Sequence, residues 1–571
     1  MPVPPLDNFD HYPRMAHWFN PVLLFKLLVN VILSSIFGSY ADRRLMIAAL
    51  DTSDSDELFG RAAAAKAMLP KGEDGSIWID FVADLGDGFD STYAVASLLA
   101  KRTLILDDLA LSKGQALIMG GDEVYPKATE NAYRYQLRLP YVWASPDPHP
   151  ESQKGVPLYA LPGNHDWYDG LVLFLAYFCG HKSTRFGGWR AYQRRSYFAI
   201  QLTETWWLWA IDIQLADNMD QPQYDYFTLI AERMPEHSRI ILCSAEPGWL
   251  YTDTNSKSWE ITDYALGIVA AAKRGLSVPI VLSGDTHHYN RYVGPDGTQY
   301  ITSGGGGAFL HPTHQLEQNV TVSLSNNPQQ LTLATASDKG ASPAVYPSFE
   351  ISRQLVWRNW FFAFTNWDFS ILMGLIYWLL AIAIILRDEW DMYGFIAGIF
   401  GWSLIGYTTH QEKSYRPTVL ITSALHSSAH VLVLIFAARW LATFNDAHFP
   451  LSGAWYDIWE WLGILLVEMF PIGFLVGGSL FGWNMMLTCR YFRMNRNDAF
   501  SALRIGAYNN FVRMKISEDR VDVFVVGLEH VPSRDEWEKN SNHKPNTPDE
   551  PRFVPKDPLR PHLIETFSRT F

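Results

Sequence analysis

Short apolar runs recur through the first half of the chain, and each one ends at or near a Gly, Asp or Pro. These runs cover residues 77–82, 116–119, 158–161, 240–243 and 280–282. Continuous apolar runs of this length are typical of strands that are buried on both faces. Intervening segments, such as residues 92–109, are candidates for covering helices. The pattern therefore predicts an α/β domain, in which polar side chains gather at the carboxyl ends of the strands.

Longer apolar segments with few charges follow after residue 360. They cover residues 371–386, 392–407, 419–441 and 461–487, and Trp residues border them, as is common for membrane spans. Two of them fall short of the ~20 residues that a helical span usually needs. If the first segment begins at residue 361 and the helices are tilted, the pattern predicts an α-helical transmembrane bundle of four spans. Three spans with one re-entrant segment is the alternative.

Positively charged residues near the span ends predict the orientation of this bundle. They precede the first span, lie between the second and third, and follow the fourth: Arg353, Arg358, Lys413, Arg416, Arg490, Arg493 and Arg496. The opposite loops, residues 387–391 and 445–459, are acidic or neutral. Because Lys and Arg concentrate on the cytoplasmic side, we expect the chain before and after the spans to face the cytoplasm. The 3 Cys residues are widely separated and offer no disulfide framework, which agrees with that compartment.

The N-terminal region contains an apolar segment at residues 19–37, which includes Lys26 and Asn30. It lies too far from residue 1, behind Pro-rich and acidic residues, to resemble a signal peptide. We expect an interfacial helix there, within a membrane-associated region of residues 1–50. A core helix of the soluble domain and a fifth span are the alternatives.

The C-terminal region alternates between apolar and polar residues at 511–516 and 521–526, as strands do. This alternation predicts a small, separate cytoplasmic domain within residues 489–571. Residues 536–561 repeat Pro, Asp, Lys and Asn, a composition that favours a mostly disordered tail.

Ionisable residues lie inside two of the predicted spans. His426 and His430 share one face of the third span because they stand four residues apart, and Glu468 lies in the fourth. Such residues are costly in a membrane and usually face the interior of the bundle. They indicate either hydrogen bonds between helices or a site for a metal ion, haem or lipid phosphate.

Polar residues with ligand chemistry follow all five apolar runs of the α/β domain. The five segments are Asp84-Leu85-Gly86, Gly121-Asp122-Glu123-Val124-Tyr125, Gly163-Asn164-His165-Asp166, Ala245-Glu246-Pro247 and Gly284-Asp285-Thr286-His287. Hydrolysis of a phosphate ester needs positive charge near oxygens that are already negative, and two divalent ions held by carboxylates and imidazoles supply it. Asp122 is the natural bridge between two ions, because the preceding Gly120 and Gly121 let the backbone turn sharply.

The stretch from Ser76 to Thr313 resembles the calcineurin-like metallophosphoesterases. Its Asp-x-Gly and Gly-Asp-x-x-Tyr segments are similar to those of purple acid phosphatases, and Gly163-Asn164-His165-Asp166 is the most specific match. The resemblance implies a metallophosphoesterase-type β-sandwich flanked by helices, which we expect over residues 51–350. It also implies a centre of two divalent metal ions.

The resemblance also implies a role for each matching residue. Asp84 and His287 would bind the first ion. Asn164 and Asp285 would bind the second, and Asp122 would bind both. His165 would stabilise the leaving oxygen or the transition state, with Asp166 orienting its imidazole.

The chain departs from the family at three positions where an imidazole is usual: Gly86, Ala245 and Asp285. By the purple acid phosphatase pattern Tyr125 would complete the first site, with Asp87 as an alternative. Asp285 can bind through its oxygens, and Glu246 is the only neighbour able to replace the side chain lost at Ala245. A site with this many oxygen ligands favours Mn²⁺, Mg²⁺ or Ca²⁺ over Zn²⁺, and iron is a further candidate if Tyr125 binds the metal.

These patterns together predict a multi-pass membrane protein, with its spans in residues 360–488 and its phosphoesterase domain in the cytoplasm. We expect hydrolysis of a phosphomonoester or phosphodiester by a metal-activated hydroxide, with a lipid-linked phosphate as the favoured substrate. A degenerate phosphate or nucleotide sensor that signals through the membrane is the alternative, and a transporter or haem-binding module regulated by the domain is another. The net charge of -13 and the lack of a basic cluster argue against a nucleic-acid partner.

Overall fold

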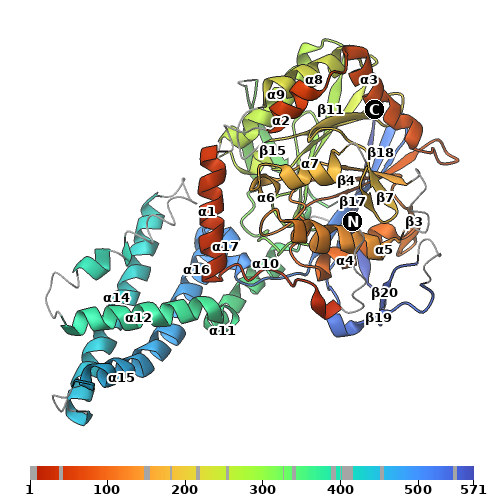
Figure 1. The fold of residues 1–571 in the computed structure, drawn as a ribbon. Coiled ribbons are helices and arrows are strands. Elements are labelled where there is room, and N and C mark those ends of the chain that lie inside the picture. The colour runs from red at the N-terminus through yellow and green to blue at the C-terminus, as the bar shows by residue number, and fades with distance from the viewer. Residues whose placement is uncertain are drawn as a thin grey trace. The chain divides into compact units, whose positions relative to one another are not determined.

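The computed structural model describes residues 9–37, 43–146, 155–180, 183–213, 219–252, 256–325, 327–336, 342–386, 394–398, 400–401, 416–449, 455–543 and 550–571. The chain forms two compact units (Figure 1). The sheet unit comprises Met1–Ala16, Leu27–Phe349 and Gly506–Phe571, and the helical unit comprises His17–Lys26 and Glu350–Ile505.

The sheet unit contains two large sheets. The first has the strand order β21 (Pro561–Thr570), β18 (Arg520–Leu528), β17 (Asn509–Ile516), β1 (Ile77–Val82), β4 (Ala116–Met119), β5 (Val156–Ala160), β7 (Trp189–Ala191) and β6 (Arg185–Phe186). The second runs β14 (Asn319–Leu324), β15 (Asn327–Leu333), β12 (Tyr289–Val293), β13 (Gln299–Ser303), β11 (Ser277–Ser283), β10 (Arg239–Ser244), β9 (Trp206–Ile211) and β8 (Phe198–Gln201), and β16 (Val345–Tyr346) pairs with β12. In the first sheet β1, β4 and β5 are parallel, and in the second β9, β10, β11 and β13 are parallel.

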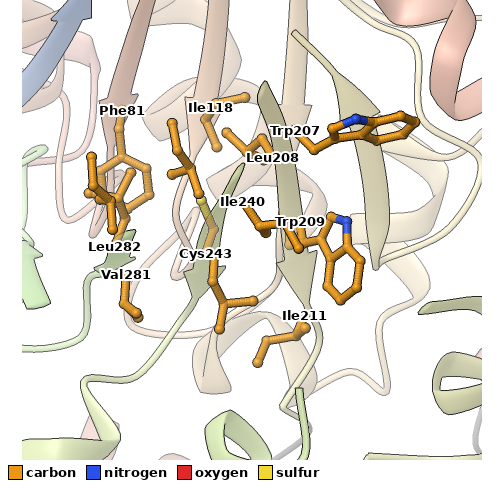
Figure 2. Packing of buried hydrophobic residues seen from close by; sticks show 14 of the residues in the cluster. Phe81, Ile118, Trp207, Leu208, Trp209, Ile211, Ile240, Cys243, Val281 and Leu282 are labelled. Carbon is orange, nitrogen blue, oxygen red and sulfur yellow. The ribbon is translucent and has the colours of Figure 1, made fainter. Parts of the chain in front are cut away.

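Side chains from both sheets meet in one buried cluster. Figure 2 shows Phe81 and Ile118 from the first sheet in the same cluster as Trp207, Ile240 and Leu282 from the second. Side chains on a strand alternate between its two faces. The other face of the first sheet therefore packs against helices such as α4 (Asp90–Ala100) and α5 (Leu139–Ala144) in a second cluster. The mixed α/β fold predicted from the apolar runs is confirmed.

The sheet unit also contains further helices and a β-hairpin. Its other helices are α2 (Arg43–Leu50), α3 (Ser55–Ala64), α6 (Asn164–Trp167), α7 (Val172–Phe178), α8 (Gln221–Arg233) and α9 (Ser256–Ala271), and β2 (Thr103–Leu106) pairs with β3 (Leu109–Ser112).

The C-terminal strands correct one prediction. Both predicted strands are present as β17 and β18, but they do not form a separate small domain, because β17 pairs antiparallel with β1 inside the first sheet. Arg513 of β17 is fully buried and its guanidinium binds both carboxylate oxygens of Asp80, at 2.6 and 2.9 Å. The tail is also more ordered than predicted, since β19 (Trp537–Lys539) pairs with β20 (Phe553–Pro555). Within that tail, residues 544–549 lie outside the described part of the chain.

The helical unit carries the long apolar helices. Its elements are α10 (Phe349–Leu355), α11 (Phe362–Thr365), α12 (Trp367–Leu386), α14 (Arg416–His448), α15 (Asp457–Ile472), α16 (Gly478–Phe492) and α17 (Arg496–Ser501), and α1 (Pro21–Phe37) begins in it. Among the described residues, 3 helices are long and apolar enough to cross a membrane: Trp367–Leu386, Pro417–His448 and Asp457–Phe492. They correspond to the first, third and fourth predicted spans. Most of the second, residues 392–407, lies outside the described residues.

Candidate active site

Three aspartates leave their strands through the left-handed region of backbone conformation. Asp84 follows β1 with φ 59°, Asp122 follows β4 with φ 50°, and Asp285 follows β11 with φ 65°. Residues with a side chain rarely adopt this conformation, and it persists where the surroundings enforce it, often at functional sites. All three lie at carboxyl ends of parallel strands, as the sequence predicts.

The hydroxyl of Tyr125 lies at the centre of the candidate first metal site. It is 2.9 Å from Oδ1 of Asp84 and 3.0 Å from Oδ2 of Asp122. It is also 2.9 Å from Nε2 of His287, whose Nδ1 donates to the carbonyl of Phe309 at 2.6 Å. Because that carbonyl can only accept, Nε2 presents a lone pair to Tyr125. One hydroxyl proton cannot satisfy two carboxylates and an imidazole lone pair.

Burial and mutual repulsion raise the energy of the negative charge at this site. Burial, followed by the nearby carboxylate of Asp285, raises the pKa of Asp122 to about 7. Burial also raises the pKa of Asp84 well above its usual range, and it lowers the pKa of His287 to about 3. A bound cation would offset the charge of the carboxylates, which a neutral interior cannot do.

Two buried oxygens test whether metal ions fit here. Oδ2 of Asp84 and Oδ1 of Asn164 are buried and have no hydrogen-bond partner. Within the described part of the chain, no group of three His, Cys, Asp or Glu side chains is gathered closely enough to hold a metal by itself. The hydroxyl of Tyr125 lies among the donors of the candidate first site. With Tyr125 included, the donors fit a hard or borderline cation.

Backbone atoms pack tightly against the carboxylates. A Cβ atom on Gly163 would lie 2.1 Å from Oδ1 of Asp122, and one on Gly304 would lie 2.3 Å from Oδ2 of Asp84. The close approach at Gly163 lets the amide of His165 donate to Asp122 at 2.8 Å. Glycine at 163 and 304 thus allows the loops to close around the carboxylates.

The segment from Gly163 to Asp166 differs in one respect from its predicted role. Asp166 accepts hydrogen bonds from the amides of Gly163 and Glu123, at 3.0 and 3.1 Å, and from the hydroxyl of Tyr133. It does not hydrogen-bond to the imidazole of His165, whose Nδ1 donates to the carbonyl of Pro126 at 2.8 Å. Because Asp166 lies in the first turn of α6, its carboxylate faces the backbone amides, and it shapes the loop instead of orienting the imidazole.

The candidate second site is less complete. Asp285 is half-buried and accepts a hydrogen bond from the hydroxyl of Tyr251. Ala245 is buried against the turn that carries Asp122. A Cβ atom on Gly121 would lie 2.8 Å from the Cβ of Ala245. Glu246 is half-buried just after β10, and its role as a ligand stays a prediction.

Two side chains beside the candidate ligands were not predicted from the sequence. Glu123 is fully buried, and neither of its carboxylate oxygens has a hydrogen-bond partner. The ring of His311 stacks on that of His287 with centroids 4.0 Å apart. Glu123 directly follows the predicted ligand Asp122, and this position in the sequence could have indicated that it lies near the site. No motif indicated His311. Asp87, the predicted alternative to Tyr125, accepts a hydrogen bond from the amide of Ala16 at 3.0 Å. The hydroxyl of Tyr125 lies in the candidate first site.

One protein family matches the part of the chain that contains the candidate site. Residues 77–289 match the sequence model of the Calcineurin-like phosphoesterase family, and this part of the chain is a calcineurin-like phosphoesterase domain. Every candidate ligand lies within those residues. No curated protein matches the chain.

Two solved structures are similar over part of the chain. PhoD is 11% identical with a TM-score of 0.28, and the match covers 46% of this chain and 63% of that one. Purple acid phosphatase PPD1 from yellow lupin (Lupinus luteus) seeds is 13% identical with a TM-score of 0.26, over 42% of this chain and 46% of that one. The chain therefore matches less than two thirds of the length of either.

Proposed function

We propose that the chain is a membrane-anchored, metal-dependent phosphoesterase that hydrolyses a phosphomonoester or phosphodiester. The observation that carries this proposal is the convergence of Asp84, Asp122 and His287 on the hydroxyl of Tyr125. Buried acceptors that share a single proton are poorly stabilised without a cation. Such an arrangement is expected of a site built to bind one.

The residues divide between two ions. Asp84, Tyr125 and His287 would hold the first, Asn164 and Asp285 the second, and Asp122 would bridge both. Glu246 is the remaining candidate for the second. When bound, two such ions supply a nucleophilic water of lowered pKa and positive charge beside the phosphate. The oxygen-rich donor set favours Mn²⁺, Mg²⁺ or iron.

His165 would contribute a proton at the leaving oxygen. Burial lowers the pKa of its imidazole to about 4, so the free enzyme holds it neutral, with the proton on Nδ1 beside the Pro126 carbonyl. The charge of a bound phosphate raises the pKa of a nearby imidazole. Protonation then adds a proton at Nε2 while Nδ1 keeps its bond to Pro126, so Nε2 is the donor to the leaving oxygen.

The membrane part of the proposal follows from chain connectivity. Strands on both sides of the helical unit, β1 and β17, pair in one sheet, so the chain must leave and re-enter the same side of a membrane. The number of crossings between them is therefore even. Three described helices can cross, and a fourth crossing by residues 392–407 would restore an even count. The Lys and Arg pattern favours the cytoplasm for the sheet unit.

Ala245 favours a second candidate function. Its methyl group supplies no metal ligand, so a weak second site would leave a domain that binds phosphate without hydrolysing it. In that case the domain would act as a sensor for a phosphate or nucleotide.

Turnover of a water-soluble aryl phosphate with added Mn²⁺ tests the proposal. Asp122→Asn should lower turnover by at least ~10³-fold, because an amide cannot offset the charge of two ions. Asp107→Asn is the matched control, since Asp107 is also left-handed (φ 49°) but exposed in the β2–β3 turn. Near-normal turnover in Asp122→Asn would refute the two-metal assignment. Phosphate binding without turnover in the wild type would favour the sensor.

A further inference from the structure

Helix α1 is an apolar helix that the protein leaves largely uncovered. Val22, Phe25 and Leu28 are 61%, 67% and 57% exposed, and Ile32 is 46% exposed. Lys26 is its one charged residue. Exposed apolar surfaces of this kind mark contacts with another protein or with a membrane.

The segments before and after α1 both fold into the sheet unit. Before the helix, Phe9 and Tyr12 are buried against Phe89, with ring centroids 5.2 and 5.0 Å apart. After it, Arg44 is 3% exposed in the sheet unit. A single crossing would separate these residues by a bilayer, so α1 cannot be a fifth span. Its 17 residues also extend only about 26 Å, less than the ~30 Å hydrocarbon core.

The first turn of α1 is fixed to the start of a membrane span. Oδ1 of Asn20 accepts from the amides of Val22 and Leu23, each at 3.1 Å, and its Nδ2 donates to Asp368 at 3.0 Å. Asp368 lies in the first turn of α12, which is the first candidate span. The end of a span lies at the membrane surface. A bilayer is therefore within reach of α1, and this argues for lipid as its partner.

Aromatic packing strengthens this attachment. Phe19, just before α1, is 6% exposed and contacts three other rings of the helical unit. Their centroids lie 5.2, 5.6 and 5.9 Å away, in Phe362, Phe369 and Phe481.

The next helix in the chain, α2, contacts the loop that carries part of the candidate active site. Arg43 begins α2, six residues after Phe37, and donates to the carbonyl of Gly170 at 2.8 Å. The guanidinium of Arg44 lies 4.9 Å from the ring of Trp167, the last residue of α6. Because α6 begins with Asn164 and His165, α2 contacts the helix that carries two of the candidate site residues.

We propose that α1 lies in the interfacial plane of the bilayer and holds the phosphoesterase site close to phosphate groups carried by lipids. The substrate class is therefore a lipid whose phosphate projects from the membrane surface. This substrate assignment rests on the proposed function, whereas the lipid contact of α1 does not.

The lipid contact is tested on the full chain reconstituted in phosphatidylcholine–phosphatidylglycerol vesicles. In a background without Cys179, Cys243 and Cys489, a fluorophore is attached at Phe25→Cys or at Ile105→Cys, and bromine-labelled lipids serve as the quencher. Ile105 is the matched control because it is apolar and 71% exposed in the β2–β3 hairpin. Strong quenching at position 25 with none at position 105 is expected. Equal quenching at the two positions would overturn the proposal.

The substrate assignment is tested with phosphatidic acid in the same vesicles and a soluble aryl phosphate. The double variant Phe25→Glu, Leu28→Glu should lower kcat/KM for phosphatidic acid about tenfold, because orientation at the surface is lost, and leave that for the aryl phosphate unchanged. Ile105→Glu should change neither. An unchanged ratio between the substrates would overturn the assignment. Absence of both activities in the wild type would instead refute the proposed function and leave the quenching result standing.

Discussion

At the scale of single residues, close contacts between backbone and carboxylates hold the candidate site in shape. Gly163→Ala would place a methyl group 2.1 Å from Oδ1 of Asp122, so the loop or the carboxylate must move. We expect a loss of about 1–3 kcal/mol in the free energy of unfolding, together with weaker Mn²⁺ binding. Thermal unfolding and calorimetric metal titration measure these effects.

Gly267→Ala is the control for that prediction. Gly267 lies within α9, and a Cβ there would meet nothing within 4 Å. Alanine should therefore raise the free energy of unfolding by about 0.5–1 kcal/mol, because glycine is a poor helix former. A Gly163→Ala variant that binds Mn²⁺ as the wild type does would contradict the described geometry.

The candidate site residues could be named from the sequence, but their contacts could not. The motifs pointed to Asp84, Asp122 and Tyr125 because each follows an apolar run. They did not show that Asp166 faces backbone amides, since this depends on how α6 begins. Glu123 and His311 escaped notice for the same reason, because packing within the fold brings them to the site.

At the scale of elements, the pairing of β17 with β1 is the feature that the sequence could not supply. Alternation predicted the strand itself, but its partner lies more than 400 residues away, and local patterns carry no information on such pairing. The pair Arg513–Asp80, at 2.6 Å, joins these strands with both side chains buried.

Breaking this pair should be costly. Arg513→Met would leave the Asp80 carboxylate buried without its partner, and we expect a loss of about 3–5 kcal/mol in the free energy of unfolding. The matched control is Arg520→Met on the adjacent β18, where Arg520 is 52% exposed in its pair with Asp522. The control should cost less than about 1 kcal/mol. Similar losses in chemical denaturation of the two variants would argue against a structural role for β17.

At the scale of the whole molecule, the proposed even number of crossings and the proposed cytoplasmic location of the sheet unit can be tested together. Trp455, 83% exposed just before α15, belongs to a loop that the charge pattern places outside the cytoplasm. In intact cells a membrane-impermeant maleimide should label Trp455→Cys. It should not label Ile105→Cys until the membrane is opened. Labelling of Ile105→Cys in intact cells would reverse the orientation.

The candidate spans could be predicted from composition alone. Three of the four predicted segments coincide with long apolar helices, because hydropathy over a span is a strong signal. Composition did not show whether α1 crosses the membrane. Our proposal that it does not cross rests on Phe9 and Arg44, which fold into one unit on either side of it.

Tyr125 and its three partners are proposed to form a metal site. Anomalous scattering from crystals grown with Mn²⁺ tests this proposal, since it locates the metal and its ligands together. We expect an ion bound by Asp84, Asp122, Tyr125 and His287, with a second ion beside Asn164 and Asp285. Crystals that contain Mn²⁺ elsewhere, or none at these residues, would contradict it.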